Sequence, residues 1–203
     1  MDEQRRRIEG LIREILGEAY LNLIVDRYSF EEDVATSEGR IRCELHHPRT
    51  GERRVIEGNG VGVIDAFFGG LKEALAPDFP SLETIRFTGF SVHGVMDSRR
   101  APVGSDALGK VTLEVQNSHG VPFEFSHESR SVTASAVEVT LKAAAYFVNS
   151  ERAVIQSYRA LQDAKARGRQ DLVELYTGHM AELVKNTSYS SVIEEIEKEV
   201  NGK

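Results

Sequence analysis

The stretch RIRCELHHPRTGERRVIEGNGVGVIDA, residues 40–66, decides the fold of this 203-residue chain. Over residues 40–46, apolar and polar side chains alternate strictly, and the apolar ones are Ile41, Cys43 and Leu45. Successive side chains of a strand point to opposite faces of its sheet, so this alternation predicts a strand with one buried face.

The rest of the stretch predicts how this strand continues. Pro48-Arg49-Thr50-Gly51 has the composition of a turn, and residues 52–57 can return as a paired strand. A glycine-rich bend over residues 58–62 then opens a segment, residues 63–76, with the apolar spacing of a helix. Gly69 and Gly70 lie inside that segment, and they indicate that another element approaches the helix closely.

The same order of elements repeats later in the chain. Residues 110–116 alternate, residues 117–120 turn, residues 122–126 return as a strand, and a helix is expected from Ser131 to Val148. The N-cap of that helix is expected at Ser129 or Ser131, a better account of these hydroxyls than nucleophilic chemistry.

The offset between the two copies is nearly constant. The turn residues Gly51 and Gly120 are 69 positions apart (120 − 51), and the same offset relates Val63 to Val132 and Asp65 to Ala134. The alternating strands need an offset of 70 instead. A hairpin that is one residue shorter in the second copy would produce this difference, so the pattern indicates an internal duplication.

Each copy also has a candidate leading strand, around Tyr28–Thr36 and Leu82–Val95. We therefore expect an α+β fold of two βββα units, related by pseudo-twofold symmetry and flanked by N- and C-terminal helices. The segment Glu3–Ala19 has the stripe of an amphipathic helix, and the chain after Glu151 is helical with a break at Gly168.

These patterns divide the chain into an N-terminal amphipathic helix in residues 1–27, the duplicated domain in residues 28–150 and a helical extension in residues 151–203. The formal net charge of −7 argues against a nucleic-acid partner, because phosphate binding requires an excess of Lys and Arg. No apolar run is long enough to span a bilayer, and the first residues do not have the pattern of a signal peptide, so we expect a cytoplasmic protein.

The glycine-rich bend is the first candidate ligand site. A helix start leaves backbone N–H groups free to bind an anion, and Asp65 offers a carboxylate to an ammonium group. Together these suit the two charged ends of an amino acid. The geometry of a tight turn explains the same glycines without a ligand, and their spacing does not follow a dinucleotide or P-loop motif.

Three motifs of the chain resemble the C-terminal regulatory domain of 2-isopropylmalate synthases and citramalate synthases. Gly60-Val61-Gly62-Val63-Ile64-Asp65-Ala66 resembles its GxGPVDA motif. Ser105-Asp106-Ala107-Leu108-Gly109-Lys110-Val111 resembles its "sDAlg-V" strand entry. Ser131-Val132-Thr133-Ala134-Ser135-Ala136 resembles the start of its second helix, and the resemblance covers roughly residues 28–149.

In that family, two βββα units form a dimerising domain that binds leucine or isoleucine between the helix-start loops of the units. The resemblance thus implies a homodimer, a branched-chain amino acid or related acid as ligand, and a separate synthase subunit as possible partner. The ligand-binding residues that it implies are Gly60, Gly62, Val63, Ile64, Asp65 and Ala66 in one loop and Ser131, Val132 and Ala134 in the other. Val63 replaces the proline of the motif, and Arg130 replaces an acidic or amide residue, which changes the charge offered to a ligand.

No catalytic machinery is expected in this chain. The catalytic barrel of those synthases needs about 250 residues to itself. His46 and His47 are adjacent in a strand, so they tend to point to opposite faces, and the other histidines are scattered without the spacing of metal ligands. We therefore expect no cofactor, no metal and no enzyme activity; the alternative function is a structural or assembly module that keeps the dimer fold without a ligand.

Overall fold

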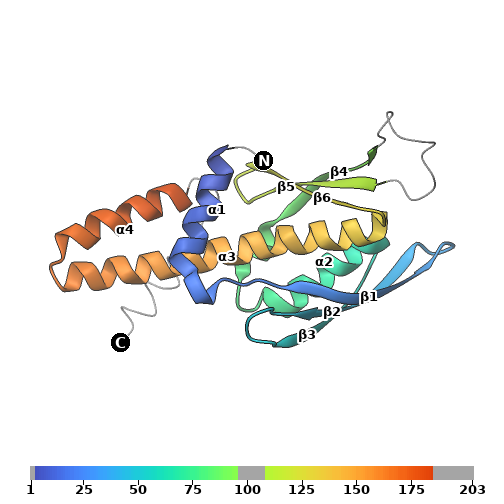
Figure 1. Cartoon of the computed structure of the whole chain (residues 1–203), viewed down its shortest axis with the longest axis horizontal. Coiled ribbons are helices and arrows are strands. Elements are labelled where there is room, and N and C mark those ends of the chain that lie inside the picture. Colours follow the sequence, from blue (N-terminus) through green and yellow to red (C-terminus); the bar gives the residue numbers. More distant parts are fainter. Residues whose placement is uncertain (1–2, 96–107, 185–203) are drawn as a thin grey trace.

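The first βββα unit forms a three-stranded antiparallel sheet followed by a helix. The computed structural model describes residues 3–95 and 108–184 of the chain (Figure 1). Its first sheet has the order β1 (Ile24–Asp33), β2 (Glu38–His46) and β3 (Arg53–Gly60), and α2 (Gly62–Leu75) follows directly. The predicted hairpin and helix of residues 40–76 are therefore confirmed.

The second unit repeats this order. The short 3-10 helix η2 (Pro80–Thr84) leads into the second sheet, which consists of β4 (Arg86–Val95), β5 (Leu108–Gln116) and β6 (Pro122–Ser129). The helix α3 (Val132–Ala166) follows β6 as α2 follows β3.

The remaining helices lie across and beyond α3. α1 (Glu3–Leu16) ends in the 3-10 turn η1 (Gly17–Ala19) and crosses α3, while α4 (Gln170–Leu183) runs back along the far end of α3 (Figure 1). Within the described residues, every helix is too short or too polar to cross a membrane.

The strand pairing of the two sheets is equivalent. Phe30 pairs with Ile41 in the first sheet as Val92 pairs with Val111 in the second. Each leading strand also has a bulge near its start, between Val25 and Arg27 in β1 and between Phe87 and Gly89 in β4. The hairpin connection spans residues 47–52 in the first unit and residues 117–121 in the second, which is one residue fewer. The shorter hairpin explains the two sequence offsets and confirms the duplicated α+β fold.

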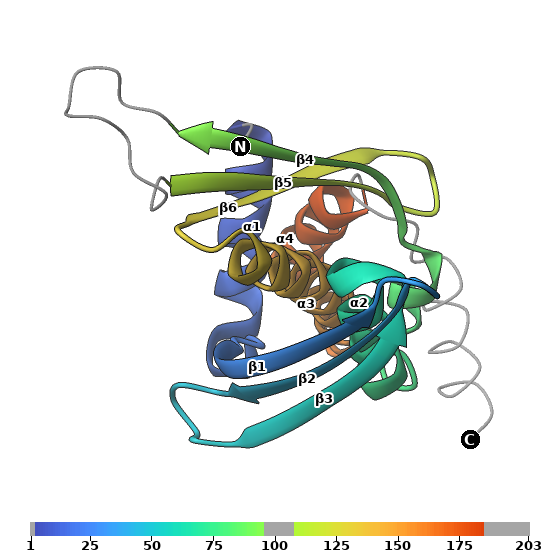
Figure 2. The ribbon, with the colours of Figure 1, turned by 90° about the vertical axis from the view of Figure 1, so that its right-hand side faces the viewer.

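The two sheets lie on opposite sides of the helix pair, which gives the pseudo-twofold form that the duplication predicts (Figure 2). α2 packs against β2 and β3, α3 packs against β5 and β6, and the two helices pack against each other. The inward-facing side chains of the central strands are buried: Ile41, Cys43, Leu45, Val111, Leu113 and Val115. Burial in this core raises the pKa of the Cys43 thiol to about 12.

Glycines allow α2 to lie directly on β3. A Cβ atom on Gly58 would meet the carbonyl oxygen of Ala66, and one on Gly70 would meet the carbonyl oxygen of Glu57, both well under the 3.0 Å that real Cβ atoms keep. Close helix–sheet approach, expected from the glycine pair in this helix, is therefore confirmed. Gly60 is equally crowded, because its Cβ would overlap the start of α2.

The structure corrects several expected boundaries. The second helix continues from Val132 to Ala166 instead of ending at Val148, because no Gly or Pro interrupts it. The expected junction between residues 150 and 151 therefore falls inside α3, and the junction between residues 27 and 28 falls inside β1. The break at Gly168 is confirmed, since this residue has a φ of 66° between α3 and α4.

The leading strands also differ from their expected bounds. β1 begins at Ile24 and ends at Asp33, earlier than residues 28–36. The segment before Arg86 forms η2 rather than strand, since Pro80 has no N–H to donate to a ladder. The expected helix over residues 3–19 divides into α1 and η1. Residues 105–107 of the second family-like motif lie outside the described residues.

The glycine contact between α2 and β3 predicts the effect of substitution. We expect Gly58→Ala to lower the free energy of unfolding by about 2–4 kcal/mol, because strand and helix must separate. Gly10→Ala is the matched control: nothing lies within 4 Å of a Cβ there, and the change should stabilise α1 by about 0.5–1 kcal/mol. Urea denaturation of both variants measures the difference, and equal stabilities would contradict the packing role.

Candidate functional site

The first predicted loop lies between β3 and α2 and is closed by its own aspartate. The Oδ2 atom of Asp65 accepts a hydrogen bond of 2.9 Å from the backbone N–H of Val61, so one carboxylate oxygen caps the helix start. Gly62 has a φ of 75°, which allows the chain to turn there. The loop geometry thus accounts for Gly60, Gly62 and Asp65 through packing and capping.

The second predicted loop, between β6 and α3, is closed by serines. The Ser131 hydroxyl accepts a hydrogen bond of 3.1 Å from the backbone N–H of Ala134, which confirms Ser131 as the N-cap. The Ser129 hydroxyl donates to the Ser131 carbonyl and lies 2.8 Å from the hydroxyl of Ser135. Val132, the first residue of the helix, is 46% exposed.

Both loops lie at the same end of the molecule, where α2 and α3 begin side by side (Figure 1). The only predicted site residue that lines the open hollow beside the first loop is Gly60, which shares it with Asn59, Val61 and the β1–β2 turn. Among the described residues of the second unit, none lines this hollow. The two loops therefore do not enclose a common pocket within the described part of one chain.

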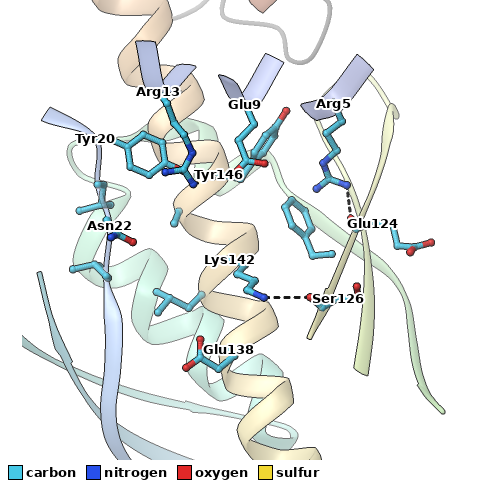
Figure 3. A pocket seen from close by; sticks show the side chains of 15 residues that line it. Arg5, Glu9, Arg13, Tyr20, Asn22, Glu124, Ser126, Glu138, Lys142 and Tyr146 are labelled. Atoms are coloured by element: carbon cyan, nitrogen blue, oxygen red, sulfur yellow. Dashed lines mark hydrogen bonds and ion pairs between the residues drawn. The ribbon is translucent and has the colours of Figure 1, made fainter. Parts of the chain in front are cut away.

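A better enclosed cleft of about 490 Å³ lies between α1, the segment before β1, β6 and α3 (Figure 3). It carries side chains of both charges, from Arg5, Glu9, Arg13, Glu138 and Lys142. Its apolar walls come from Leu21, Leu23, Phe125, Leu141, Ala145 and Tyr146. We refer to it below as the α1 cleft.

Arg5 holds α1 against the second unit. Its guanidinium carbon lies 4.0 Å from the ring centroid of Phe125 and 5.3 Å from that of Tyr146, and NH1 donates to the carbonyl oxygen of Glu124. Burial against these rings lowers the pKa of Arg5. The stacked guanidinium forms one end wall of the α1 cleft.

Asn149 of α3 holds the opposite wall. Its Oδ1 atom accepts from the N–H of Leu21 at 2.7 Å, and its Nδ2 donates to the carbonyl oxygen of the same residue at 2.8 Å. The Asn149 side chain, which is 1% exposed, thereby makes the two backbone hydrogen bonds that a neighbouring strand would otherwise make with the segment before β1. On the α1 side, Arg13 stacks on Tyr20 at 4.2 Å and pairs with Glu9 at 3.2 Å.

The α3 wall presents a carboxylate and an ammonium that do not pair with each other. Glu138 and Lys142 are four residues apart and both line the α1 cleft. The Lys142 ammonium instead donates to the Ser126 carbonyl at 3.4 Å and lies 3.1 Å from Nδ1 of His127. Glu138, half-buried, has neither a hydrogen bond nor an ion pair among the described residues.

Tyr146 lies one further turn along the same face of α3. Its side chain is 6% exposed, and burial raises the pKa of its hydroxyl to about 12. The hydroxyl oxygen is buried without a hydrogen-bond partner in the described part of the chain. Figure 3 shows the phenol ring behind Glu9, between Arg13 and Arg5.

Sequence reasoning did not identify the α1 cleft. Glu138 and Lys142 have the spacing of an ordinary exposed ion pair on a helix, so their pattern gives no signal of a site. Arg5 belongs to a charged helix face that is typical of solvent exposure. In the described residues, no group of three or more His, Cys, Asp or Glu side chains could hold a metal ion.

The sequence was compared with family models and with curated proteins. No family model matches the sequence, and no curated protein matches it. The resemblance to the regulatory domain of the 2-isopropylmalate synthases therefore remains a hypothesis that depends on the motifs alone.

The Asn149 contact predicts how the α1 cleft is held together. We expect Asn149→Ala to lower the free energy of unfolding by about 2–3 kcal/mol, because it leaves two backbone groups of Leu21 without partners. Gln156→Ala removes a single exposed bond, from Nε2 to the carbonyl oxygen of Ile15, and should cost less than about 1 kcal/mol. Chemical denaturation distinguishes the two, and a neutral Asn149→Ala would contradict the holding role.

Proposed function

We propose that this chain is a ligand-binding, regulatory-type module rather than an enzyme, similar to the regulatory domain of 2-isopropylmalate synthases. Its ligand is a small amino acid or a related 2-keto or 2-hydroxy acid, and the ligand occupies the α1 cleft. One observation carries this proposal: side chains of both charges and apolar side chains line one cleft of about 490 Å³.

The cleft has the properties of a small-molecule site. Ligand sites are concave and largely apolar, with a few polar groups that fix orientation, and volumes of about 300–1,000 Å³ are typical. Lys142, Arg13 and Arg5 can attract a carboxylate. The walls come from four separate elements, so a bound molecule would join α1 to the second unit.

A regulatory role fits these walls better than catalysis. The cleft residues nearest to a nucleophile–base pair are Ser126 and Lys142, and the lysine contacts the serine through its backbone carbonyl rather than its hydroxyl. A ligand that stabilises the docking of α1 can change the surface offered to a partner. We propose that this partner is a separate synthase subunit.

We also propose that the chain is a homodimer, joined at the end where α2 and α3 begin. Exposed apolar side chains gather at the starts of these elements: Val61, which is 72% exposed, Leu108 and Val132. Gly109 lies beside Val132, so the start of β5 meets the start of α3 there. The same observation favours the second candidate function, an assembly module without a ligand.

The dimer proposal predicts the effect of a charge at this end. We expect Val132→Glu to raise the dimer dissociation constant at least about tenfold, because each copy of the symmetric interface would bury the new carboxylate. Val121→Glu is the control, since this exposed valine lies in the β5–β6 turn at the other end. Sedimentation velocity over a concentration series measures both, and a monomeric wild-type protein would contradict the proposal.

The ligand proposal predicts a thermal shift with amino, 2-keto or 2-hydroxy acids. A ligand at a hundred times its dissociation constant should add about 2.7 kcal/mol of stability. Lys142→Met should abolish the shift, whereas Asp65→Asn should keep it, because an asparagine can still accept from Val61. If Asp65→Asn abolished the shift and Lys142→Met kept it, the ligand site would lie in the helix-start loops instead. No shift with any of these acids would leave the assembly module as the function.

A further inference from the structure

We infer that the ligand of the α1 cleft is an α-amino acid, held as a zwitterion with its ammonium on Glu138 and its carboxylate on Lys142. This inference rests on the proposed function, and it selects the amino acid over the keto and hydroxy acids. Its basis is the set of polar side chains along one face of α3.

Three side chains on successive turns of α3 face the cleft: Glu138, Lys142 and Tyr146. Residues four apart are neighbours on a helix surface, with about 5–6 Å between their Cβ atoms. The face therefore presents in order a carboxylate, an ammonium and an aromatic ring. The first accepts from an ammonium group and the second donates to a carboxylate.

The carboxylate of Glu138 and the ammonium of Lys142 do not pair with each other. A glutamate four residues before a lysine ordinarily forms an ion pair on a helix. Here Lys142 lies against β6, where the Ser126 carbonyl and the His127 ring hold its ammonium. Glu138 is left half-buried in the cleft wall with no ion pair in the described part of the chain. An α-amino acid carries both complementary charges on neighbouring atoms, so it can bridge this separation.

The ammonium group of the ligand is what should distinguish amino acids from keto acids in this cleft, for an electrostatic reason. A half-buried carboxylate without a cationic partner loses hydration, and a bound ammonium would replace that hydration with a charge-assisted hydrogen bond. A 2-keto acid has no ammonium, and its own carboxylate would lie close to Glu138 with like charge. The cleft should therefore discriminate against keto acids that have the same side chain.

The remaining walls define where the rest of the ligand lies. The ring of Tyr146 lies beyond Lys142 along α3, and its hydroxyl is buried. Leu23, Leu141 and Ala145 give apolar surface beside these polar groups, and the cleft volume of about 490 Å³ leaves room for an apolar side chain. The geometry thus fits amino acids with apolar side chains.

Matched ligand pairs test the inference on the full chain. Isothermal titration would compare leucine and phenylalanine with the 2-keto acids that carry the same side chains. We expect each amino acid to bind at least about tenfold more tightly than its keto acid, the effect of one hydrogen bond between charged groups. We expect Glu138→Gln to remove this difference by weakening only the amino acids, and Lys142→Met to weaken both classes.

Every other outcome contradicts either the zwitterion or the proposed function. Glu128→Gln is the matched control, since this exposed glutamate of β6 lies outside the cleft lining and its loss should change no affinity. Keto acids that bind as tightly as amino acids, or a Glu138→Gln variant that weakens both classes equally, would overturn the zwitterion while leaving the proposed function. No binding of either class would overturn the proposed function as well. The wild-type comparison decides the matter even if a variant fails to fold.

Discussion

Every layer of this molecule except the first sheet, which packs on α2, packs against α3, and the burial of α3 is the constraint on which the rest depends. The first part of the helix lies between the second sheet and α2, its middle supports α1, and its far end carries α4. Two polar side chains of the buried helix have hydrogen-bond partners in the segments that pack on it, which offsets the cost of their burial. Asn149 bonds the backbone of Leu21, and the buried Glu151 accepts from the N–H of Ser81 at 3.0 Å. These two contacts attach the segments that precede both sheets to one helix.

The two units share their strand register but pack their helices differently. Glycines at positions 58 and 70 bring α2 directly onto β3, whereas the positions 69 residues later are His127 and Val139. α3 therefore lies on β6 through side chains, among them Phe125 and Tyr146. Arg5 of α1 stacks on this pair, and the cleft forms beside it. The asymmetry between the units accordingly explains why β6 and α3 of the second unit line this cleft together with α1.

Local patterns predicted the repeat, its hairpins, the Ser131 cap and the break at Gly168, because each depends on neighbouring residues. The predicted end of α3 at Val148 was wrong. A local sequence pattern does not show whether a helix ends at the edge of a domain core or continues beyond it. The α1 cleft could not be predicted, because Arg5 and Phe125 meet across 120 residues (125 − 5) only after folding. The helix-start loops have the expected position, but backbone and side-chain contacts within each loop use the groups that a ligand was expected to meet.

The continuity of α3 also has a mechanical consequence. At 1.5 Å per residue, its 35 residues form a rod about 52 Å long. Glu138 lies near the start of that rod, and the turn into α4 lies at its other extremity. A small tilt at the cleft is therefore magnified at the distal tip by simple leverage. A tilt of α3 near Glu138 would therefore move α4 further than it moves the second sheet.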